Sequence, residues 1–437
     1  MSRSPRFVRP RGKPAAGLPR TLEIDIVELG GRGDGIGSFD GQSVFVPCTV
    51  PGDRVLVRVD GRKSDGLAAS VIELLTPGEG RISPRCRHFG TCGGCALQHL
   101  EDSRYDVWKR KQLVVALSRA GFSEDLIAPM IRVAPGSRRR ATFTFLRRRG
   151  DLLIGFHARA SHQVIDIAEC PLLADQLLTV LQPLRDLLPA IIEDGAVGDV
   201  VVTATGNGLD LLIEAESRLD LFDRERLAAF AQSLDLARLS WRRPGVGLVE
   251  PLAHRRPAEV RFADVTVEPP PGAFLQPCPE GEQALTSLVV AAVGAASPVA
   301  DLYSGCGSFT FPLAVKAVVH AVEGDASSLQ ALKTAAERSQ SRVTAECRDL
   351  SQRPLLADEL KRFQAVVLDP PRAGAGAQAG QLAEVGPPLV VAVSCNPATL
   401  ARDARILAGG GYRLKIVTPV DQFPWSAHLE AVAVFER

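Results

Sequence analysis

The sequence predicts a multidomain protein with a small β-barrel, a central α+β domain and a C-terminal doubly wound α/β domain. Three observations predict this order. Short alternating strands with turn signals fill the first part of the chain, and mixed strand and helix patterns fill the middle. Regular alternation of strands and helices fills the last part, which is typical of a parallel sheet. With 437 residues, the chain is long enough for two to four domains.

The composition is that of an ordinary globular protein, with 46% hydrophobic and 23% charged residues. It excludes a mostly disordered chain, a collagen-like fibre and a coiled coil. We find no run of about 18 apolar residues that would span a membrane. The basic N-terminus leads into no apolar segment of a secretory signal. We therefore expect a cytoplasmic protein without a membrane partner, and a monomer.

The net charge of +1 conceals an uneven distribution. Residues 264–437 carry 14 basic and 18 acidic side chains, so the excess of basic groups lies in the front part. The first twenty residues hold six basic groups and no acid, and two Arg triplets occupy 138–140 and 147–149. A basic front part indicates a polyanionic partner such as nucleic acid. For either triplet alone, ordinary solvated surface charge explains the pattern equally well.

The first elements in order are an arm and a barrel. Residues 1–17 are rich in Arg, Pro and Gly and predict a flexible basic arm. A five-stranded barrel of the oligonucleotide-binding type is predicted over 18–76. Its turn signals lie at 30–37, 40–41 and 51–53. The strand patterns occupy residues 22–27, 44–46, 55–59 and 68–75.

The central domain is predicted over 77–262. It begins with a helix near Gln98 that closes at Gly121, and this helix (about 97–121) is a candidate to pack on the C-terminal domain. An antiparallel sheet with one or two helices is expected after it. The strand patterns occupy residues 141–146, 152–157, 200–205 and 209–215.

The C-terminal domain is predicted over 263–437, where strands and helices alternate after a Pro-rich break. Ligands of such doubly wound sheets bind at the carboxyl ends of the strands. Each strand end should therefore carry functional residues. The predicted strands occupy residues 299–303, 318–322, 342–345, 365–368 and 389–393.

The first two strand ends indicate an adenosine-type ligand. The first strand runs into Gly305-Cys306-Gly307, a loop whose backbone can approach a ligand before a helix N-terminus. By itself this loop also suits many dinucleotide enzymes. The second strand ends in Glu323, at the spacing expected of an acid that binds ribose hydroxyls. A solvated Glu323 is the weaker alternative.

The fourth and fifth strand ends indicate chemistry on a base. Asp369 is followed by two prolines, which fix a rigid turn. An acid followed by two prolines here recurs in enzymes that methylate nucleic acid bases. Cys395 precedes a helix N-terminus, where the helix dipole should lower the thiol pKa and favour the thiolate. A buried structural cysteine is the alternative.

Nine cysteines, an odd number in a cytoplasmic chain, make a disulfide framework improbable. Four have the spacing of metal ligands: Cys86, Cys92, Cys95 and, much later, Cys170. Structural zinc and an iron–sulfur cluster are both compatible with four thiolates. A thioredoxin-like role is disfavoured, because no strand–helix pattern of that kind surrounds the pair at 92 and 95.

Several motifs resemble those of the RNA uracil-5-methyltransferases, in that family's order. The segment 394–403, SCNPATLARD, looks like the nucleophile motif, and 423–430, FPWSAHLE, looks like the general-base motif. The four cysteines are similar to the family's iron–sulfur motif. The barrel at 18–76 resembles a TRAM domain, the RNA-binding module of the branch that methylates 23S ribosomal RNA. The resemblance covers nearly the whole chain after the arm.

The resemblance implies roles for particular residues. Cys395 would be the nucleophile and Glu430 the general base, while the four cysteines would hold a [4Fe–4S] cluster, with zinc as the alternative. S-adenosylmethionine would be the cofactor. Its binding residues would be Gln276, Tyr303, Ser308, Glu323, Asp349 and Asp369. The sequence departs from the family at three positions, with Cys278 and Ser308 where Asn is usual and Tyr303 where Phe is common.

The expected function is methylation of C5 of a uridine in 23S ribosomal RNA, and the alternative substrate is the T-loop uridine of transfer RNA. Two other classes are disfavoured. A non-catalytic RNA-binding protein would not need Cys395 and Glu430. A radical enzyme would need three cysteines in a Cys-x3-Cys-x2-Cys run, which is absent. Phe274 is a candidate to stack on an unpaired base.

Overall fold

The computed structural model describes residues 20–437, and the predicted arm at 1–17 lies outside them. The described chain forms two compact units, each built from segments far apart in the sequence, whereas the predicted domains are continuous. Among these residues, no helix combines the length and apolarity that crossing a membrane requires. The first unit holds residues 20–112, 154–171 and 423–427, and the second holds 113–153, 172–422 and 428–437.

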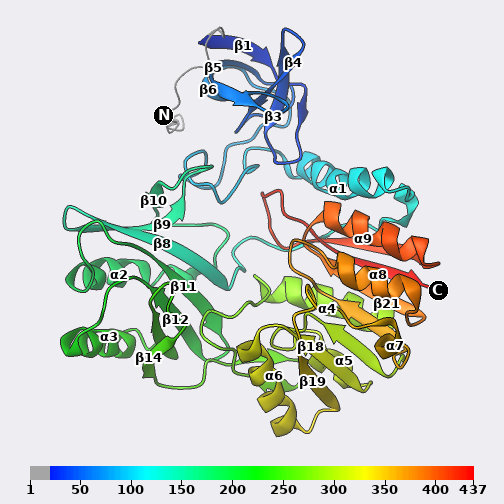
Figure 1. Cartoon of the computed structure of the whole chain (residues 1–437). Coiled ribbons are helices and arrows are strands. Elements are labelled where there is room, and N and C mark those ends of the chain that lie inside the picture. Colours follow the sequence, from blue (N-terminus) through cyan, green and yellow to red (C-terminus); the bar gives the residue numbers. More distant parts are fainter. Residues whose placement is uncertain (1–19) are drawn as a thin grey trace. The chain divides into compact units, whose positions relative to one another are not determined.

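The N-terminal part of the first unit is a six-stranded sheet wrapped around one apolar core (Figure 1). The strand order is β1-β5-β6-β4-β3-β2. Buried Leu22, Ile24 and Ile26 alternate with exposed residues, as a half-buried strand requires. The strands are β1 (Thr21–Asp25), β2 (Glu28–Leu29), β3 (Gly35–Phe39), β4 (Gln42–Val46), β5 (Arg54–Lys63) and β6 (Gly66–Thr76).

The turn predicted over 30–37 is wrong at its end, because β3 begins at Gly35. The glycines of β3 serve close packing. A β-carbon on Gly35 would lie 2.0 Å from Thr49 Oγ1, and one on Gly37 would lie 2.2 Å from Ile24 Cγ2. Glycine within a strand marks such close approaches as well as turns, and the sequence does not distinguish the two.

A loop with little regular structure leads from β6 to helix α1 (Asp102–Arg119). The helix begins later than predicted because residues from Gln98 to Glu101 form hydrogen bonds with residues of the preceding loop and not with the first turn of a helix. Gln98 Oε1 accepts a hydrogen bond from the Cys86 amide (3.1 Å), and the Glu101 amide donates to Gly80 O (2.8 Å). The predicted end is confirmed to within two residues, at Gly121 with φ +92°.

The central part of the second unit is a mostly antiparallel sheet. β12 and β13 form a parallel pair in it, which the sequence did not predict. Helix α3 (Leu221–Ser233) packs on β13 and β14, and α2 (Leu181–Leu187) lies beside it. The strands are β8 (Arg140–Arg148), β11 (Val197–Thr205), β12 (Gly208–Glu214), β13 (Arg238–Arg242) and β14 (Val249–His254). Beyond β8 the chain continues into the hairpin of β9 (Asp151–His157) and β10 (Val164–Asp166).

The C-terminal sheet has the order β19-β18-β17-β20-β21-β23-β22-β7. The five predicted strands are parallel, which confirms the doubly wound core. Two antiparallel strands and a short segment from far earlier in the chain extend it. The strands are β17 (Val299–Leu302), β18 (Val319–Glu323), β19 (Val343–Cys347), β20 (Ala365–Leu368), β21 (Leu389–Ser394), β22 (Arg413–Asp421), β23 (Glu430–Glu436) and β7 (Ile131–Arg132).

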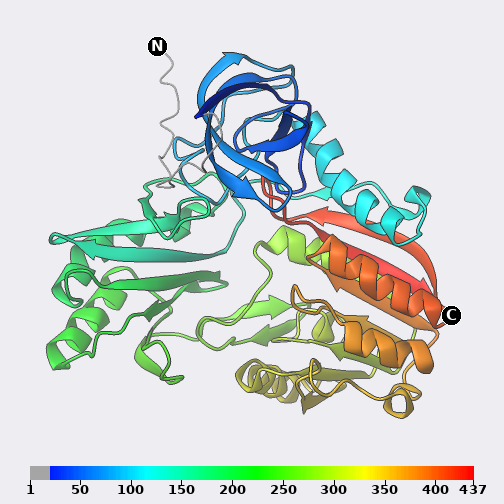
Figure 2. The same cartoon turned by 45° about the horizontal axis from the view of Figure 1, so that its top comes forward.

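Helices cover both faces of this sheet (Figure 2). Side chains alternate between two separate apolar clusters: Val366 and Val390 lie in one, and Val367 and Val391 in the other. Strands buried on both faces explain the continuous apolar runs in the sequence. The helices are α4 (Pro279–Val293), α5 (Thr310–Ala314), α6 (Ala326–Ser339), α7 (Ala357–Leu360), α8 (Gly376–Glu384) and α9 (Pro397–Gly409). A hairpin of β15 (Val260–Phe262) and β16 (Val265–Val267) precedes them, and 3-10 turns occupy Glu124–Leu126, Asp175–Leu177 and Leu188–Ala190.

Candidate active site

The predicted site residues of the C-terminal domain gather at one edge of its sheet. The parallel strands are in register there, with Leu302 opposite both Val322 and Leu368. The residues that follow these strands therefore emerge side by side, as expected for a doubly wound fold. They are Tyr303 and Ser308 after β17, Glu323 at the end of β18, Asp349 after β19, Asp369 after β20 and Cys395 after β21.

Glu323 holds the loops around the predicted cofactor site. Its two carboxylate oxygens accept hydrogen bonds from the amides of Gly305 (2.8 Å) and Asp325 (2.7 Å). Each oxygen keeps a lone pair for a further donor. Tyr303 has a left-handed backbone (φ +63°), which turns the chain sharply from β17 into the glycine loop. Exposed Asp349 accepts from the Ser351 hydroxyl (2.6 Å).

The sequence analysis missed Asp301, a fully buried acid on β17. Its Oδ2 accepts from the Thr310 hydroxyl (2.5 Å), whereas Oδ1 has no hydrogen-bond partner among the described residues. Burial raises the pKa of Asp301 to about 7. A burial signal was present, because Asp301 lies within the apolar run of a two-faced strand.

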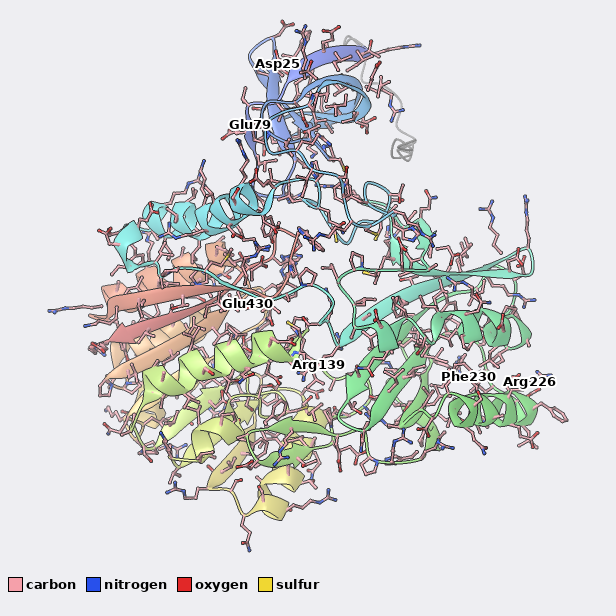
Figure 3. All side chains as sticks on the ribbon, turned by 180° about the vertical axis from the view of Figure 1, so that it is seen from behind. Asp25, Glu79, Arg139, Arg226, Phe230 and Glu430 are labelled. Atoms are coloured by element: carbon pink, nitrogen blue, oxygen red, sulfur yellow. The ribbon has the colours of Figure 1, made fainter. Side chains whose placement is uncertain are left out.

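Cys395 and Glu430 lie at adjoining ends of two antiparallel strands. The pairing of β21 and β23 ends at Ser394 opposite Ala431, Cys395 follows Ser394, and Glu430 is the first residue of β23. The two side chains are near enough for the charge of Glu430 to raise the pKa of the Cys395 thiol. Figure 3 shows Glu430 at this end of the sheet. The antiparallel β23 thus brings the predicted base to the predicted nucleophile.

The prediction of a lowered thiol pKa at Cys395 is wrong. Burial, followed by the charges of Glu430 and Asp369, raises the pKa of Cys395 to about 11. Arg372 opposes this shift without cancelling it. The dipole of α9 is worth at most about 2 kcal/mol, and two carboxyl groups and desolvation outweigh it here. The thiol is therefore protonated at neutral pH.

Two hydrogen-bonded glutamines lie beside the carboxyl groups of the site. Gln422 Nε2 donates to Gln276 Oε1 (2.8 Å), and Gln276 Nε2 donates to Asp369 Oδ2 (3.3 Å). The nearby Gln422 side chain acts to lower the pKa of Glu430. Burial, then the charge of Asp369, raises the pKa of Glu430 to about 8, and burial raises that of Asp369 to about 7. Gln276, predicted to bind cofactor, lies in this network, and the sequence analysis missed Gln422.

The other polar residues of the 394–403 motif hold the turn that follows Asp369. Asn396 caps α9 and donates to Arg372 O (3.1 Å), and Thr399 donates to the same carbonyl (3.4 Å). Arg402 Nη2 donates to Ala373 O (2.9 Å). The motif therefore combines one reactive side chain with the residues that fix the neighbouring loop.

The first Arg triplet is part of the protein's own structure. Arg139 pairs with Glu282 in the first turn of α4 (2.7 Å), beside which Figure 3 shows it. Arg140 Nη2 donates to Gly272 O (3.2 Å). Arg139 and Arg140 therefore have structural roles within the protein, and a nucleic acid contact by this triplet stays a prediction. Arg148 and Arg149 of the second triplet are exposed.

The four predicted metal ligands lie in the first unit. Burial is the main cause of the raised pKa values of Cys86, Cys92 and Cys95, and Cys170 raises all three further. The four thiols are thus near enough to interact, and their sulfur donors suit iron or zinc. As arranged, however, no group of three or more His, Cys, Asp or Glu side chains within residues 20–437 could hold a metal ion.

The segment before Glu430 also belongs to the first unit. Fully buried Lys109 donates to Phe423 O (3.0 Å) and Ser426 O (2.8 Å). Trp425 O accepts from the amides of Ala96 (2.7 Å) and Leu97 (3.2 Å), which directly follow Cys95. The backbone that directly follows Cys95 and the segment 423–427 are therefore joined by hydrogen bonds.

A doubly wound sheet with a glycine loop and an acid at its first two strand ends defines a Rossmann-like domain that suits an adenosine-type ligand such as S-adenosylmethionine. Comparisons with known proteins agree. Residues 259–437 match the tRNA (uracil-5-)-methyltransferase family, and 19–72 match the TRAM domain. The chain belongs to the RNA uracil-5-methyltransferase family and is an S-adenosylmethionine-dependent RNA (uracil-C5-)-methyltransferase. This confirms the resemblance seen in the sequence.

Relatives align over nearly the whole chain. A Rhizobium meliloti protein described as an uncharacterized RNA methyltransferase is 43% identical, over 95% of this chain and all of its own length. A Halomonas elongata protein named 23S rRNA (uracil(1939)-C(5))-methyltransferase RlmD is 34% identical, over 98% of this chain and 93% of its own length. The solved structure of the Pyrococcus abyssi tRNA (uracil-54, C5)-methyltransferase has the same fold, with a TM-score of 0.74 and 24% identity over 95% of this chain and 100% of that chain.

Proposed function

We propose that this enzyme methylates C5 of one uridine in 23S ribosomal RNA, through a covalent adduct between Cys395 and C6 of the uracil. The proximity of Cys395 and Glu430 at the adjoining ends of β21 and β23 carries the proposal. It supplies a nucleophile and a base at one end of the sheet, which is what substitution at a weakly nucleophilic carbon needs.

The ribosomal substrate is supported by two findings. The Halomonas elongata relative, which aligns over nearly all of both chains, is named for a 23S rRNA uridine. The TRAM domain is the module that the resemblance assigns to the ribosomal branch. The T-loop uridine of transfer RNA is the alternative, because residues 259–437 match a family whose description names transfer RNA uracil as the substrate.

The adduct begins with the Cys395 thiol. Because this thiol is protonated in the free enzyme, its proton has to leave when the uracil binds. Asp369, with its pKa raised to about 7, is the carboxylate that accepts this proton, since Glu430 has to be ionised at the last step. The new bond from Sγ to C6 converts C5 into an enolate carbon.

Methyl transfer and release complete the reaction. C5 takes the methyl group, whose bond to the sulfonium sulfur of S-adenosylmethionine breaks. Glu430 then removes the C5 proton, and the bond between Sγ and C6 breaks to restore the ring. A pKa of about 8 for Glu430 suits a base that works near neutral pH. The uridine has to be unpaired or flipped out of its helix. Phe274, which is exposed and lies two residues before Gln276 in the chain, would stack on the unpaired base.

The cofactor proposal assigns S-adenosylmethionine to the strand ends of the second unit. Glu323 would accept hydrogen bonds from the ribose hydroxyls, and the glycine loop it anchors would face the amino acid end. Tyr303, Ser308 and Asp349 line the same edge. In the first unit, Cys86, Cys92, Cys95 and Cys170 would hold a [4Fe–4S] cluster with a structural role, because methyl transfer involves no electron transfer.

Trapping experiments test the catalytic assignment. Cys395→Ala should form no adduct and transfer no methyl group. Glu430→Gln should methylate but release product slowly, so that a denaturation-resistant protein–RNA complex accumulates. Wild-type enzyme should form the same complex with RNA carrying 5-fluorouridine. Methylation by Cys395→Ala, or absence of any adduct in Glu430→Gln, would refute these roles.

A second experiment tests the substrate. Native-host 23S rRNA fragments and tRNA transcripts are each incubated with the enzyme and S-adenosylmethionine, and 5-methyluridine is quantified by mass spectrometry. We expect product in one 23S fragment and none in tRNA. Product in tRNA alone would replace the ribosomal substrate with the T-loop uridine.

A further inference from the structure

Arg139, which has no part in the proposed reaction, is bonded to the backbone that carries Gln276. Its backbone amide donates to Pro277 O (2.8 Å), and its Nε donates to Gln276 O (3.1 Å). Its Nη2 donates to the Glu282 carboxylate (2.7 Å), in the first turn of α4. The Ala204 amide in β11 in turn donates to Arg139 O (2.7 Å). Arg139 therefore ties the segment of Gln276 to the central sheet of the second unit.

The pairing of Arg139 with Glu282 is protected from solvent. Their side chains are 12% and 11% exposed, so salt screens the interaction little. Burial raises the pKa of Glu282, and the charge and hydrogen bond of Arg139 oppose this shift. A guanidinium donates in fixed directions from a rigid plane, so Nε and Nη2 hold two acceptors at once. One side chain thus fixes both the segment of Gln276 and the start of the following helix.

The side chain of Gln276 continues the connection to the active site. Gln276 is 3% exposed, and its Nε2 donates to Asp369 Oδ2 (3.3 Å). Its Oε1 accepts from Gln422 Nε2 (2.8 Å), so the amino group is the part of the amide that faces Asp369. Hydrogen bonds therefore run from Arg139 through a single residue to the carboxyl group of Asp369.

We infer that Arg139 is a positioning residue for the proton acceptor of the reaction: it holds the backbone of Gln276 so that the Gln276 amide donates to ionised Asp369. This inference rests on the proposed role of Asp369, which accepts the proton of Cys395. A hydrogen bond to a carboxylate favours its ionised form. Arg139 acts through Gln276 and not on the reacting atoms.

The ionisable groups around Asp369 determine the direction of the effect. Three of them have a pKa that is raised first by burial and further by the charge of Asp369: Asp301 on β17, Cys395 after β21 and Glu430 on β23. Any of these groups that is ionised disfavours an ionised Asp369 in return. Arg372, in the turn that follows, supplies a positive charge at this edge of the sheet. Loss of the Gln276 donor should therefore increase the pH needed to ionise Asp369.

The experiment measures formation of the covalent adduct in single turnovers, as a function of pH. The probe is RNA carrying 5-fluorouridine, with saturating S-adenosylmethionine, and the adduct is quantified as a denaturation-resistant complex. The rate should rise with pH as Asp369 ionises, which gives an acidic limb. Gln276→Met should move this limb up by about one pH unit, because a hydrogen bond to a charged group is worth about that much. Arg139→Met should move it in the same direction by about half a unit, since Gln276 keeps its amide but loses the backbone support.

A double variant tests whether Arg139 acts through Gln276. In the Gln276→Met background, Arg139→Met should add no further shift, because the donor that Arg139 positions is already absent. A full additional shift would overturn the inference. Arg139→Lys keeps a cation for Glu282 but cannot hold two acceptors in the directions of a guanidinium. Its limb should lie between those of wild type and Arg139→Met, and it covers the case in which Met disrupts folding.

Arg242→Met is the matched control. Arg242 is a partly buried arginine on β13 of the same central sheet, where it pairs with Glu214 of β12 (2.6 Å). Its profile should keep the wild-type limb. An unchanged limb in both single Arg139 variants, or an equal shift in Arg242→Met, would overturn the inference. Failure of the proposed function would appear separately, as the absence of any adduct between wild-type enzyme and the 5-fluorouridine RNA.

Discussion

Cysteines occur in a different environment in each compact unit, and their thiol pKa values are raised for different reasons. In the first unit, Cys86, Cys92 and Cys95 have pKa values raised by burial and by their neighbour Cys170. In the second unit, burial and two carboxyl groups raise the pKa of Cys395 to about 11. Burial is therefore the first cause of the raised thiol pKa in both units.

The difference lies in what would lower the pKa. Four thiols that repel one another as thiolates need a cation, and a bound metal deprotonates them outright. A single thiol beside carboxyl groups needs a nearby proton acceptor and an electrophile that consumes the thiolate. The comparison teaches that a helix N-terminus is a weak predictor of thiol ionisation when the same strand edge also carries acids.

The largest expected effect is the loss of all bound iron when one of the four cysteines of the first unit is replaced. Anaerobically purified protein should be brown with about four irons per chain, and Cys86→Ser should lose them all together. Iron is quantified by colorimetry and the cluster by visible absorbance. Cys347→Ser, which changes an exposed thiol at the end of β19, is the control and should keep the iron. One zinc per chain and a colourless protein would contradict the cluster.

The second prediction tests whether cofactor binding belongs to the second unit alone. Glu323→Ala should weaken binding of S-adenosylmethionine by about 1.5–3 kcal/mol, because it removes a charged acceptor and releases the glycine loop. Isothermal titration calorimetry measures the Kd. Cys86→Ser and the exposed-acid variant Glu384→Ala should both bind as wild type does. Equal weakening in Cys86→Ser would show that the two sites depend on each other.

The third prediction concerns stability as a function of pH. The pKa of Glu430 is raised from its usual 4.5 to about 8 by folding, so its favourable contribution is complete below pH 4.5 and is lost as the pH rises through 8. Glu430→Gln should therefore be more stable than wild type at pH 8 by about 1–2 kcal/mol, a discounted value for a site with polar neighbours. Urea unfolding should show the difference shrinking towards pH 5. A constant difference across this range would contradict the assigned shift.

The smallest expected effect concerns Arg372, whose charge lowers the pKa of Cys395. Arg372→Ala should raise that pKa further, so that the rate of Cys395 alkylation by iodoacetamide rises at a pH about half a unit higher than in the wild type. The shift is small because the guanidinium is exposed and screened by salt. Mass spectrometry follows the modified peptide, and Arg372→Lys should retain the wild-type profile. A faster alkylation of Cys395 in Arg372→Ala at every pH would show that Arg372 does not lower the pKa of this thiol.

The sequence determined the parts of this protein that depend on local pattern. Continuous apolar runs followed by Gly305, Glu323 and Asp369 predicted a parallel sheet and its functional edge, because strands buried on both faces are mostly apolar and most of their polar residues lie at the ends. The motifs around Cys395 and Glu430 predicted the family. The cysteine spacing did not distinguish zinc from an iron–sulfur cluster, and the identity of the metal remains a prediction.

Only the tertiary structure decided what depends on neighbours distant in sequence. It brought Glu430 near Cys395 by an antiparallel strand, it joined Gln422 to Gln276, 146 residues away in the chain, and it paired Arg139 with Glu282. It also reversed the expected ionisation of Cys395. The physical reason is that desolvation and charge interaction depend on distances in space, which are fixed only when segments far apart in the chain pack together.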